Sequence, residues 1–244
     1  MKAFSTPAIM EASVSPHVSH AMLNDGIVEA RAYQLEAVDE ALSSSMLLVM
    51  PTAAGKTAVI WMMISEKLSR GGRVMMIAPT VGLVEQHIRS LREVLKLKDG
   101  IVQITGQLPP AKRVEKWDGA RLVVATPKVV VNDVSNGVVD LSDFSVLVVD
   151  EAHHCTGDHA MAQVCDNYIS KNVRPHILGV TASPGHRPEA VREICKRTGA
   201  VRIHIRNSAE EMLSGYLSEL EVREITVSVP DEIVRLSEPF KIWQ

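Results

Sequence analysis

Residues 51–57, Pro-Thr-Ala-Ala-Gly-Lys-Thr, decide the fold, because they follow a short apolar run and open a helical stretch. A glycine-turned loop that ends in Lys-Thr presents backbone N–H groups and an ammonium to phosphates. Gly55 lets the backbone turn closely around the phosphates. Lys56 would pair with the β- and γ-phosphates, and the Thr57 hydroxyl would ligate Mg²⁺. The general eight-residue pattern has glycine at position 50, where this chain has Met50, so that pattern is half matched.

An acidic pair supplies the second half of the expected site. A buried apolar run at 146–149 ends in Asp150-Glu151, and a buried strand delivers its last residues to the C-terminal edge of a sheet. Asp150 would hold Mg²⁺ through water, and Glu151 would polarise the attacking water as general base. We expect the Lys-Thr loop and the two carboxylates to meet across neighbouring strands. Together they predict a site that binds and hydrolyses a nucleoside triphosphate.

The rest of the chain alternates between short apolar runs and helical stretches. Helices are expected at 28–42, after the Lys-Thr loop, at 83–95 and between Pro188 and Gly199. Strand–helix–strand alternation implies an α/β fold with a mostly parallel sheet. The apolar runs, whose Val, Ile and Leu content suits strands covered on both faces, lie at 46–50, 73–78, 101–105, 121–126, 145–150, 176–181 and 201–205, and a further strand is expected at 221–229.

Composition limits what the chain can be. With 244 residues, 46% hydrophobic and 23% charged, it suits a soluble globular protein. Three cysteines form no disulfide framework, which favours a reducing compartment. No apolar stretch has the length of a signal peptide or a membrane span, so we expect a cytoplasmic protein with no membrane partner. A net charge of −3 gives no global nucleic-acid footprint, so any contact with nucleic acid must be local.

Further short motifs occur in a fixed order along the chain. They are Arg31-Ala32-Tyr33-Gln34, Ala78-Pro79-Thr80 with Gln86-His87, Ala125-Thr126-Pro127, the Asp-Glu-Ala-His run at 150–153, and Leu-Gly-Val-Thr-Ala-Ser-Pro-Gly at 178–185. With the Lys-Thr loop, these motifs make the chain resemble the first RecA-like domain of superfamily two DExH helicases. The runs at 157–160 and 181–185 are most similar to archaeal Hef and its FANCM relatives, which act on branched and forked DNA.

The resemblance implies a fold and a domain organisation. The fold would be a RecA-like P-loop NTPase, a three-layer α/β sandwich around a mostly parallel sheet, over residues 23–229. Residues 1–22 would be a flexible tail. Residues 230–244 would begin the connection to a second RecA-like domain that is absent from this chain.

The resemblance also assigns site residues, with ATP and Mg²⁺ as cofactors. The catalytic residues would be Lys56, Asp150, Glu151 and His153, and Mg²⁺ would be held by Thr57 and Asp150. ATP would be bound by Arg31, by Gln34, which reads the adenine ring in such enzymes, and by Thr52, Ala53, Ala54, Gly55, Lys56 and Thr57. Coupling of nucleotide state to domain closure would fall to Thr181, Ala182 and Ser183. Nucleic acid would be contacted by Pro79, Thr80, Gln86, Thr126 and Pro127.

Helix ends give the nucleic-acid assignment a physical basis. Thr80 and Thr126 are good N-caps, and Pro127 suits a first helical position. Free N–H groups and partial positive charge at helix N-termini can hold phosphates without a basic surface. The alternative is that both threonines only cap helices. Ala53 departs from the family, which usually has glycine there, and nucleotide binding should survive if φ of Ala53 is negative.

One cluster allows a different interpretation. Its histidines and cysteines look superficially like metal ligands, but their spacing fits no common zinc pattern. We therefore expect no structural metal. The cluster consists of His153, His154, Cys155, His159 and Cys165.

The expected function is that of an ATP-dependent DNA helicase or translocase acting on branched or forked DNA in DNA repair. An arginine finger is worth about 10³–10⁵ in turnover, so without its second lobe this chain should hydrolyse ATP weakly. Two alternatives stay open. One is a double-stranded RNA-stimulated ATPase of the Dicer or RIG-I-like type. The other is a non-hydrolysing, nucleotide-gated clamp, against which Glu151 argues because a pure switch can dispense with the base.

Overall fold

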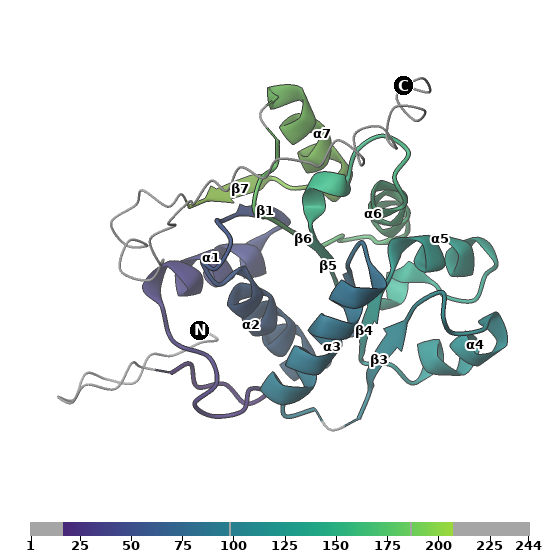
Figure 1. Ribbon diagram of the computed structural model, residues 1–244, viewed down its shortest axis with the longest axis horizontal. Coiled ribbons are helices and arrows are strands. Elements are labelled where there is room, and N and C mark those ends of the chain that lie inside the picture. Colours follow the sequence, from purple (N-terminus) through teal and green to yellow (C-terminus); the bar gives the residue numbers. More distant parts are fainter. Residues whose placement is uncertain (1–16, 98, 186, 207–244) are drawn as a thin grey trace, which may run out of the picture.

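Short runs of Val, Ile, Leu and Met form the centre of the molecule, as their burial on both faces requires. The structure, a computed structural model, describes residues 17–97, 99–185 and 187–206. Within these residues a seven-stranded sheet has the order β3-β4-β2-β5-β6-β1-β7, and every described strand pair is parallel (Figure 1). The strands are β1 (Met46–Val49), β2 (Val74–Ile77), β3 (Ile101–Ile104), β4 (Leu122–Ala125), β5 (Val146–Asp150), β6 (Ile177–Thr181) and β7 (Arg202–Ile205).

Seven helices cover the two faces of this sheet in the described part of the chain. One face carries α1 (Ala32–Ser43), α2 (Lys56–Ser69) and α3 (Val81–Val94). The other carries α4 (Pro110–Asp118), α5 (Pro127–Ser135), α6 (Ala160–Lys171) and α7 (Pro188–Thr198), with two short 3₁₀ turns, η1 (Leu141–Asp143) and η2 (Ala152–His154). Alternate strand residues feed the two cores: Leu48 packs on the first face and Leu47 on the second. The expected three-layer α/β sandwich is confirmed, and each expected strand from 46 to 205 matches within one residue.

The carboxyl ends of the parallel strands β1, β5 and β6 lie together at one edge of the sheet. Val49 of β1 lies beside Thr181 of β6, and Asp150 of β5 lies beside Val180 of β6. The loop that follows β1 and the carboxylates that end β5 therefore share this edge. The expectation that they sit on neighbouring strands is wrong, because β6 lies between β1 and β5.

The segment before α1 packs against the domain. Val18 and Leu23 are buried, a bridge joins His17 to Glu29, and Leu23 bridges to Leu95 after α3. The expected tail is therefore not loose over residues 17–22, because their apolar side chains share the core of α2 and α3. The expected helix from residue 28 begins at Ala32. Residues 1–16 and 207–244, with the expected strand at 221–229 and connection at 230–244, lie outside the described residues. None of the described helices has the length and apolar character of a membrane span.

A half-buried pair of bases lies between α2 and the start of β6. Lys67 Nζ is 3.0 Å from His176 Nδ1, and His176 Nε2 is 2.7 Å from the carbonyl oxygen of Ala41. The neutral imidazole thus donates from Nε2 and accepts from Lys67 at Nδ1. Burial, with the positive charge of Lys67, lowers the pKa of His176.

Acid should destabilise the domain through His176. The unfolded imidazole has a pKa of about 6.5, so the unfolded state takes up this proton first as pH falls. The contribution of His176 to the free energy of unfolding is present in full above the unfolded pKa. It declines as the pH falls towards the lowered pKa of the folded state. Urea unfolding of His176→Gln should show a smaller loss of free energy of unfolding between pH 7 and 5 than the parent. An equal loss in His176→Gln and in the parent would refute the assignment.

Candidate nucleotide-binding site

The loop at 51–57 turns into α2 through a glycine that no other residue could replace without rearrangement. Gly55, the N-cap of α2, has φ of 81°. A Cβ at this position would lie 2.0 Å from Gln34 Nε2. The left-handed backbone therefore favours glycine here, and a larger residue would also require the Gln34 side chain to move.

Ala53 also adopts a left-handed backbone. Its φ is 66°, so the condition of a negative φ, on which tolerance of alanine was expected to rest, is not met. The loop turns twice within three residues, at 53 and 55, and both turns need positive φ. A left-handed conformation costs an L-residue roughly 1–2 kcal/mol. The chain therefore holds backbone strain within its Lys-Thr loop.

Replacing Ala53 by glycine should raise the free energy of unfolding. Relief of the left-handed strain, less the extra entropy of glycine in the unfolded chain, leaves a gain of about 0.5–1 kcal/mol. Chemical denaturation measures it. Ala54→Gly is the matched control: Ala54 is fully buried and is not among the described residues with positive φ, so this change should destabilise. Equal destabilisation by both changes would contradict the strain at Ala53.

The Lys56 side chain folds back over the residues that precede it in the loop. Its Nζ donates to the carbonyl oxygens of Met50, at 2.9 Å, and Pro51, at 2.8 Å. Burial lowers the pKa of Lys56, while the charges of Glu151 and Asp150 act to raise it. Because β1 and β5 both end beside β6, the two halves of the expected site lie at the same edge of the sheet.

The Arg-x-Tyr-Gln element braces the same loop from α1. Gln34 Nε2 donates to Ala54 O at 3.3 Å, and the Tyr33 hydroxyl donates to the same oxygen at 3.1 Å. Arg31 donates to Glu29 Oε2, with Nε at 3.0 Å and Nη2 at 2.7 Å. The sequence assigned Arg31 and Gln34 to the site but missed Tyr33, whose place inside the motif was the available signal.

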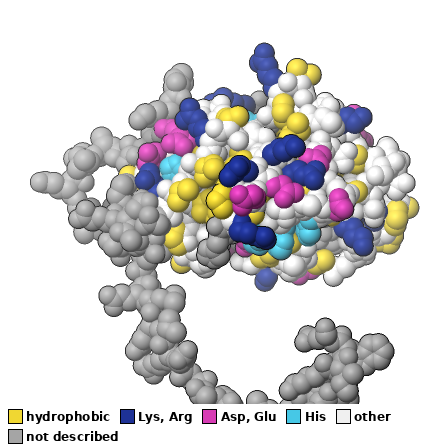
Figure 2. Space-filling model, turned by 90° about the horizontal axis from the view of Figure 1, so that it is seen from above, with side chains coloured by type: hydrophobic (Ala, Val, Ile, Leu, Met, Phe, Trp, Pro, Cys, Tyr) yellow, Lys and Arg dark blue, Asp and Glu magenta, His cyan; other side chains and the backbone are white. Residues whose placement is uncertain are grey.

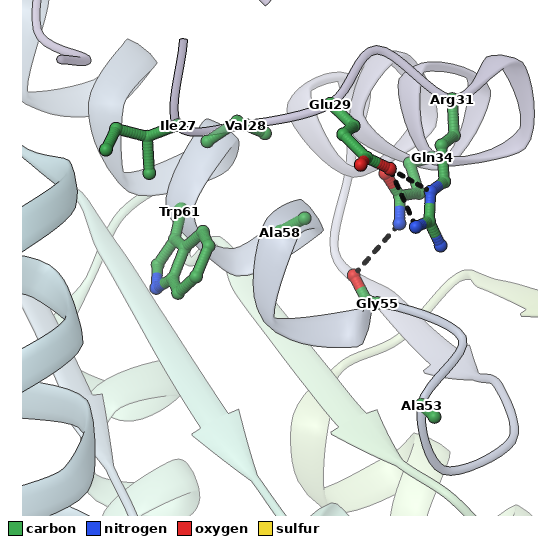
Figure 3. A pocket seen from close by; sticks show the side chains of 9 residues that line it. All are labelled: Ile27, Val28, Glu29, Arg31, Gln34, Ala53, Gly55, Ala58 and Trp61. Atoms are coloured by element: carbon green, nitrogen blue, oxygen red, sulfur yellow. Dashed lines mark hydrogen bonds and ion pairs between the residues drawn. The ribbon is translucent and has the colours of Figure 1, made fainter. Parts of the chain in front are cut away.

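A cavity of about 250 Å³ opens beside this bracing (Figure 3). Glu29, Arg31 and Gln34 line its polar side, and Ile27, Val28, Ala58 and Trp61 line its apolar side, with Ala53 and Gly55 below them. Gln34 is 2% exposed, and its Oε1 has no hydrogen-bond partner among the described residues. A buried acceptor without a partner is costly unless a ligand satisfies it. The cavity thus has the apolar walls and the hydrogen-bonding group that a nucleobase requires.

The carboxylate end of the site is linked to β6. Glu151 has a left-handed backbone, with φ of 54°, and its Oε2 lies 3.3 Å from His153 Nδ1. The same nitrogen is 3.1 Å from Thr181 Oγ1, which also hydrogen-bonds the backbone of Ser183. Thr181 is buried, whereas Ser183, after half-buried Ala182, is exposed. A continuous set of contacts therefore runs from Glu151 to the loop after β6.

Asp150 has a partner that the sequence did not predict. His87 Nε2 of α3 lies 2.7 Å from Asp150 Oδ2. The available signal was the position of His87 within the apolar face of α3. No other described side chain hydrogen-bonds Asp150, so Oδ1 can accept from another group. Asp150 and the half-buried hydroxyl of Thr57 offer oxygen ligands only, and that donor set fits Mg²⁺ with the remaining positions filled by water and phosphate.

The histidines and cysteines near this site do not assemble into a metal centre. Among residues 17–97, 99–185 and 187–206, no group of three or more His, Cys, Asp or Glu side chains could hold a metal ion. The His154 ring instead stacks on His159, with centroids 5.1 Å apart. Burial and the neighbouring His153 and His159 lower the pKa of His154. Cys155 and Cys165 are buried free thiols with sulfur atoms 3.8 Å apart.

The expected nucleic-acid residues lie at two helix starts. Thr80 is exposed and caps α3 by accepting from the Leu83 amide at 3.2 Å, and Gln86 is exposed one turn further along. Thr126 occupies the N-cap of α5 but makes no side-chain capping bond. The ring of Pro127 is buried, so the direct contact expected of it is not available, and its position at the first helical residue starts α5 instead. Pro79 is half-buried.

The surface offers no broad basic patch in the view of Figure 2. Lys and Arg side chains alternate there with Asp and Glu. This agrees with the net charge of −3. Helix N-termini are a local feature of the described residues that suits phosphates.

Comparison with known proteins places this geometry in a family. Residues 31–191 match the DEAD/DEAH box helicase family. The chain belongs to that family. Its fold is the RecA-like helicase fold: the helicase domain of Hef from Pyrococcus furiosus superposes with a TM-score of 0.78 at 30% identity, over 89% of this chain and 47% of that one.

Relatives in other organisms are much longer. A Methanocaldococcus jannaschii protein named as an ATP-dependent RNA helicase is 36% identical over 89% of this chain and 28% of its own length. The ATP-dependent DNA helicase MPH1 of Pyricularia oryzae is 31% identical over 86% of this chain and 19% of its own length. The DNA helicase Fancm of Drosophila melanogaster is 32% identical over 83% of this chain and 14% of its own length. This chain thus spans less than a third of each of these relatives.

Proposed function

We propose that this chain is the ATP-binding lobe of an ATP-dependent DNA helicase or translocase that acts on branched or forked DNA. The observation that carries the proposal is that the Lys-Thr loop after β1 and the carboxylates that end β5 share one edge of the sheet, beside a cavity lined by Gln34, whose buried Oε1 has no hydrogen-bond partner among the described residues. The DNA helicases of Pyricularia and Drosophila support the choice of DNA. A cytoplasmic location and a place in DNA repair belong to the same proposal.

Each residue of the site then has a defined task. Gln34 Oε1 accepts from the base, and the loop amides with Lys56 bind the phosphates. Glu151 accepts a proton from the attacking water. Asp150 and Thr57 would hold Mg²⁺, which neutralises charge on the β- and γ-phosphates when bound. His153, of the Asp-Glu-Ala-His motif, joins Glu151 to Thr181 and so connects the phosphate end of the site to the loop after β6.

Nucleotide binding tests the proposal directly, because Trp61 lines the base cavity. Titration with Mg·ATP should change tryptophan emission, and Trp61→Phe should remove most of that change while calorimetry still detects binding. Trp117 provides an internal reference, since it is 2% exposed and donates to Asp133 at 2.9 Å in the core between α4 and α5. Failure of the parent chain to bind either ATP or inorganic tripolyphosphate would overturn the proposal.

Turnover tests the need for a second lobe. An arginine supplied by another domain is worth about 10³–10⁵ in rate, so this chain alone should bind Mg·ATP weakly and hydrolyse it poorly. Steady-state ATPase with and without forked DNA measures this. Strong DNA-stimulated turnover by the chain alone would contradict the two-lobe proposal.

An RNA-stimulated ATPase is the second candidate. The name of the Methanocaldococcus relative, which is 36% identical to this chain, favours it. A protein that joins this domain to a second RecA-like domain should be stimulated more by forked DNA than by duplex RNA. The reverse order would favour the RNA-stimulated enzyme.

A further inference from the structure

His87 occupies an unusual place for a polar ring. It lies on the face of α3 that also carries Val84, Ile88 and Leu91, and it is 7% exposed. Its Nε2 is 2.7 Å from Asp150 Oδ2, across 63 residues of sequence. A carboxylate can only accept a hydrogen bond, so Nε2 is the donor. The single buried imidazole of this helix face is thus aimed at one of the two acidic residues of the site.

We propose that His87 is a positioning residue for Asp150 and links α3 to the bound nucleotide. Held at Oδ2, the carboxylate keeps one orientation and leaves Oδ1 available to accept from another group. This rests on the proposed function, in which Asp150 helps to hold Mg²⁺. Outer partners of metal-binding carboxylates fix their orientation, and their loss typically weakens metal affinity about 10–100-fold.

The His87–Asp150 hydrogen bond connects the proposed nucleic-acid contact at the start of α3 with the proposed nucleotide site. Thr80 caps α3 at the end proposed to meet nucleic-acid phosphates, and His87 lies six residues after the first residue of that helix. At 1.5 Å per residue this is about 9 Å along the axis. A rigid helix of this length carries a displacement at its first turn to the imidazole, and from there to Asp150. His87 therefore gives the nucleic-acid end of α3 a direct contact with the nucleotide site.

The alternative is that His87 only packs in the core. Its hydrogen bond to Asp150 would then only satisfy a buried ring nitrogen. The two explanations differ in what they predict for Mg²⁺. A core residue supports all nucleotide binding alike, with or without metal. A positioning residue for Asp150 supports the metal-dependent part alone.

The experiment compares nucleotide affinity in Mg²⁺ with affinity in EDTA, measured by calorimetry on the complete chain with a non-hydrolysable ATP analogue. His87→Leu removes the donor and keeps apolar volume. It should weaken the apparent Mg²⁺ affinity of the complex about 10–100-fold and leave the affinity in EDTA unchanged. His87→Gln keeps an N–H donor at a similar reach and should recover most of the loss, whereas His87→Asn, one bond shorter, should not.

His204→Leu is the matched control. His204 Nδ1 makes the same kind of contact, 3.1 Å from Glu40 Oε2, but joins β7 to α1. This change should lower stability without altering the dependence on Mg²⁺. The comparison of His87→Gln with His87→Asn keeps the test decisive if His87→Leu does not fold.

Three results would count against the inference. Unchanged Mg²⁺ dependence in His87→Leu, or an equal loss with and without Mg²⁺, would overturn it and leave the proposed function standing. Equal apparent Mg²⁺ affinities of His87→Gln and His87→Asn would also overturn the inference and leave the proposed function standing. Absence of nucleotide binding by the parent chain would instead overturn the proposed function, and the inference with it.

Discussion

Replacing Glu151 by glutamine is expected to reduce ATP turnover about 10²–10⁴-fold in a protein that joins this domain to a second RecA-like lobe, because glutamine cannot take a proton from water. Nucleotide binding should persist. Glutamine has the same shape, Glu151 is a half-buried side chain, and in the proposed function the phosphates are bound by the loop and Lys56. The measurement is steady-state ATPase on forked DNA together with equilibrium binding of Mg·ATP.

A distant acidic residue gives the control for Glu151. Glu189, at the start of α7, is 74% exposed and lies 3.7 Å from Arg192. Glu189→Gln should leave turnover unchanged. If Glu151→Gln kept the parent's rate, Glu151 would not be the base, and the nucleotide-gated clamp would become the better description of the site.

Replacing Asp133 by asparagine is expected to lower the free energy of unfolding by about 3–5 kcal/mol, the cost of removing one partner from a buried ion pair. Asp133 is 2% exposed and accepts three hydrogen bonds, from Arg113 Nε at 2.8 Å, Arg113 Nη2 at 2.7 Å and Trp117 Nε1 at 2.9 Å. Its hydrogen bonds, together with its charge, raise the pKa of Arg113. Without the carboxylate, the guanidinium between α4 and α5 stays buried and uncompensated. Urea denaturation gives the change in stability.

An exposed ion pair shows how much of this effect comes from burial. Arg73 Nη1 lies 3.2 Å from Asp143 Oδ2, and that carboxylate side chain is 54% exposed. Asp143→Asn should cost at most about 1 kcal/mol, as solvent-exposed pairs do. Equal losses in Asp133→Asn and Asp143→Asn would contradict the importance of burial for the Arg113–Asp133 pair.

The sheet was predictable because each strand is a continuous apolar run between turn residues. Such runs are expected where helices cover both faces, and this holds for 146–149 and for the other interior strands. The segment at 17–31 was not predictable by the same means. Val18, Leu23 and Val28 are five residues apart, a spacing that fits neither a helix nor a strand, and their burial depends on α2 and α3.

The shared edge of the Lys-Thr loop and the acidic pair was predictable from the sequence, but the contacts of these residues were not. The Lys-Thr loop and the acidic pair are local signals, and parallel topology brings them to one edge. The contact of His87 with Asp150 joins residues 63 apart, so no local pattern contains it. The positive φ of Ala53 is likewise a property of the folded loop, since alanine rarely adopts it on its own.

In the proposed function, Lys56 must exchange its present hydrogen-bond acceptors for those of the nucleotide. Its ammonium already donates to two carbonyl oxygens of its own loop, those of Met50 and Pro51. An incoming triphosphate must replace these two carbonyl oxygens as the acceptors of Lys56. The two carbonyl groups must then hydrogen-bond to water instead. Association at saturating ATP should therefore approach a first-order limit, set by how often the lysine leaves its resting position rather than by diffusion.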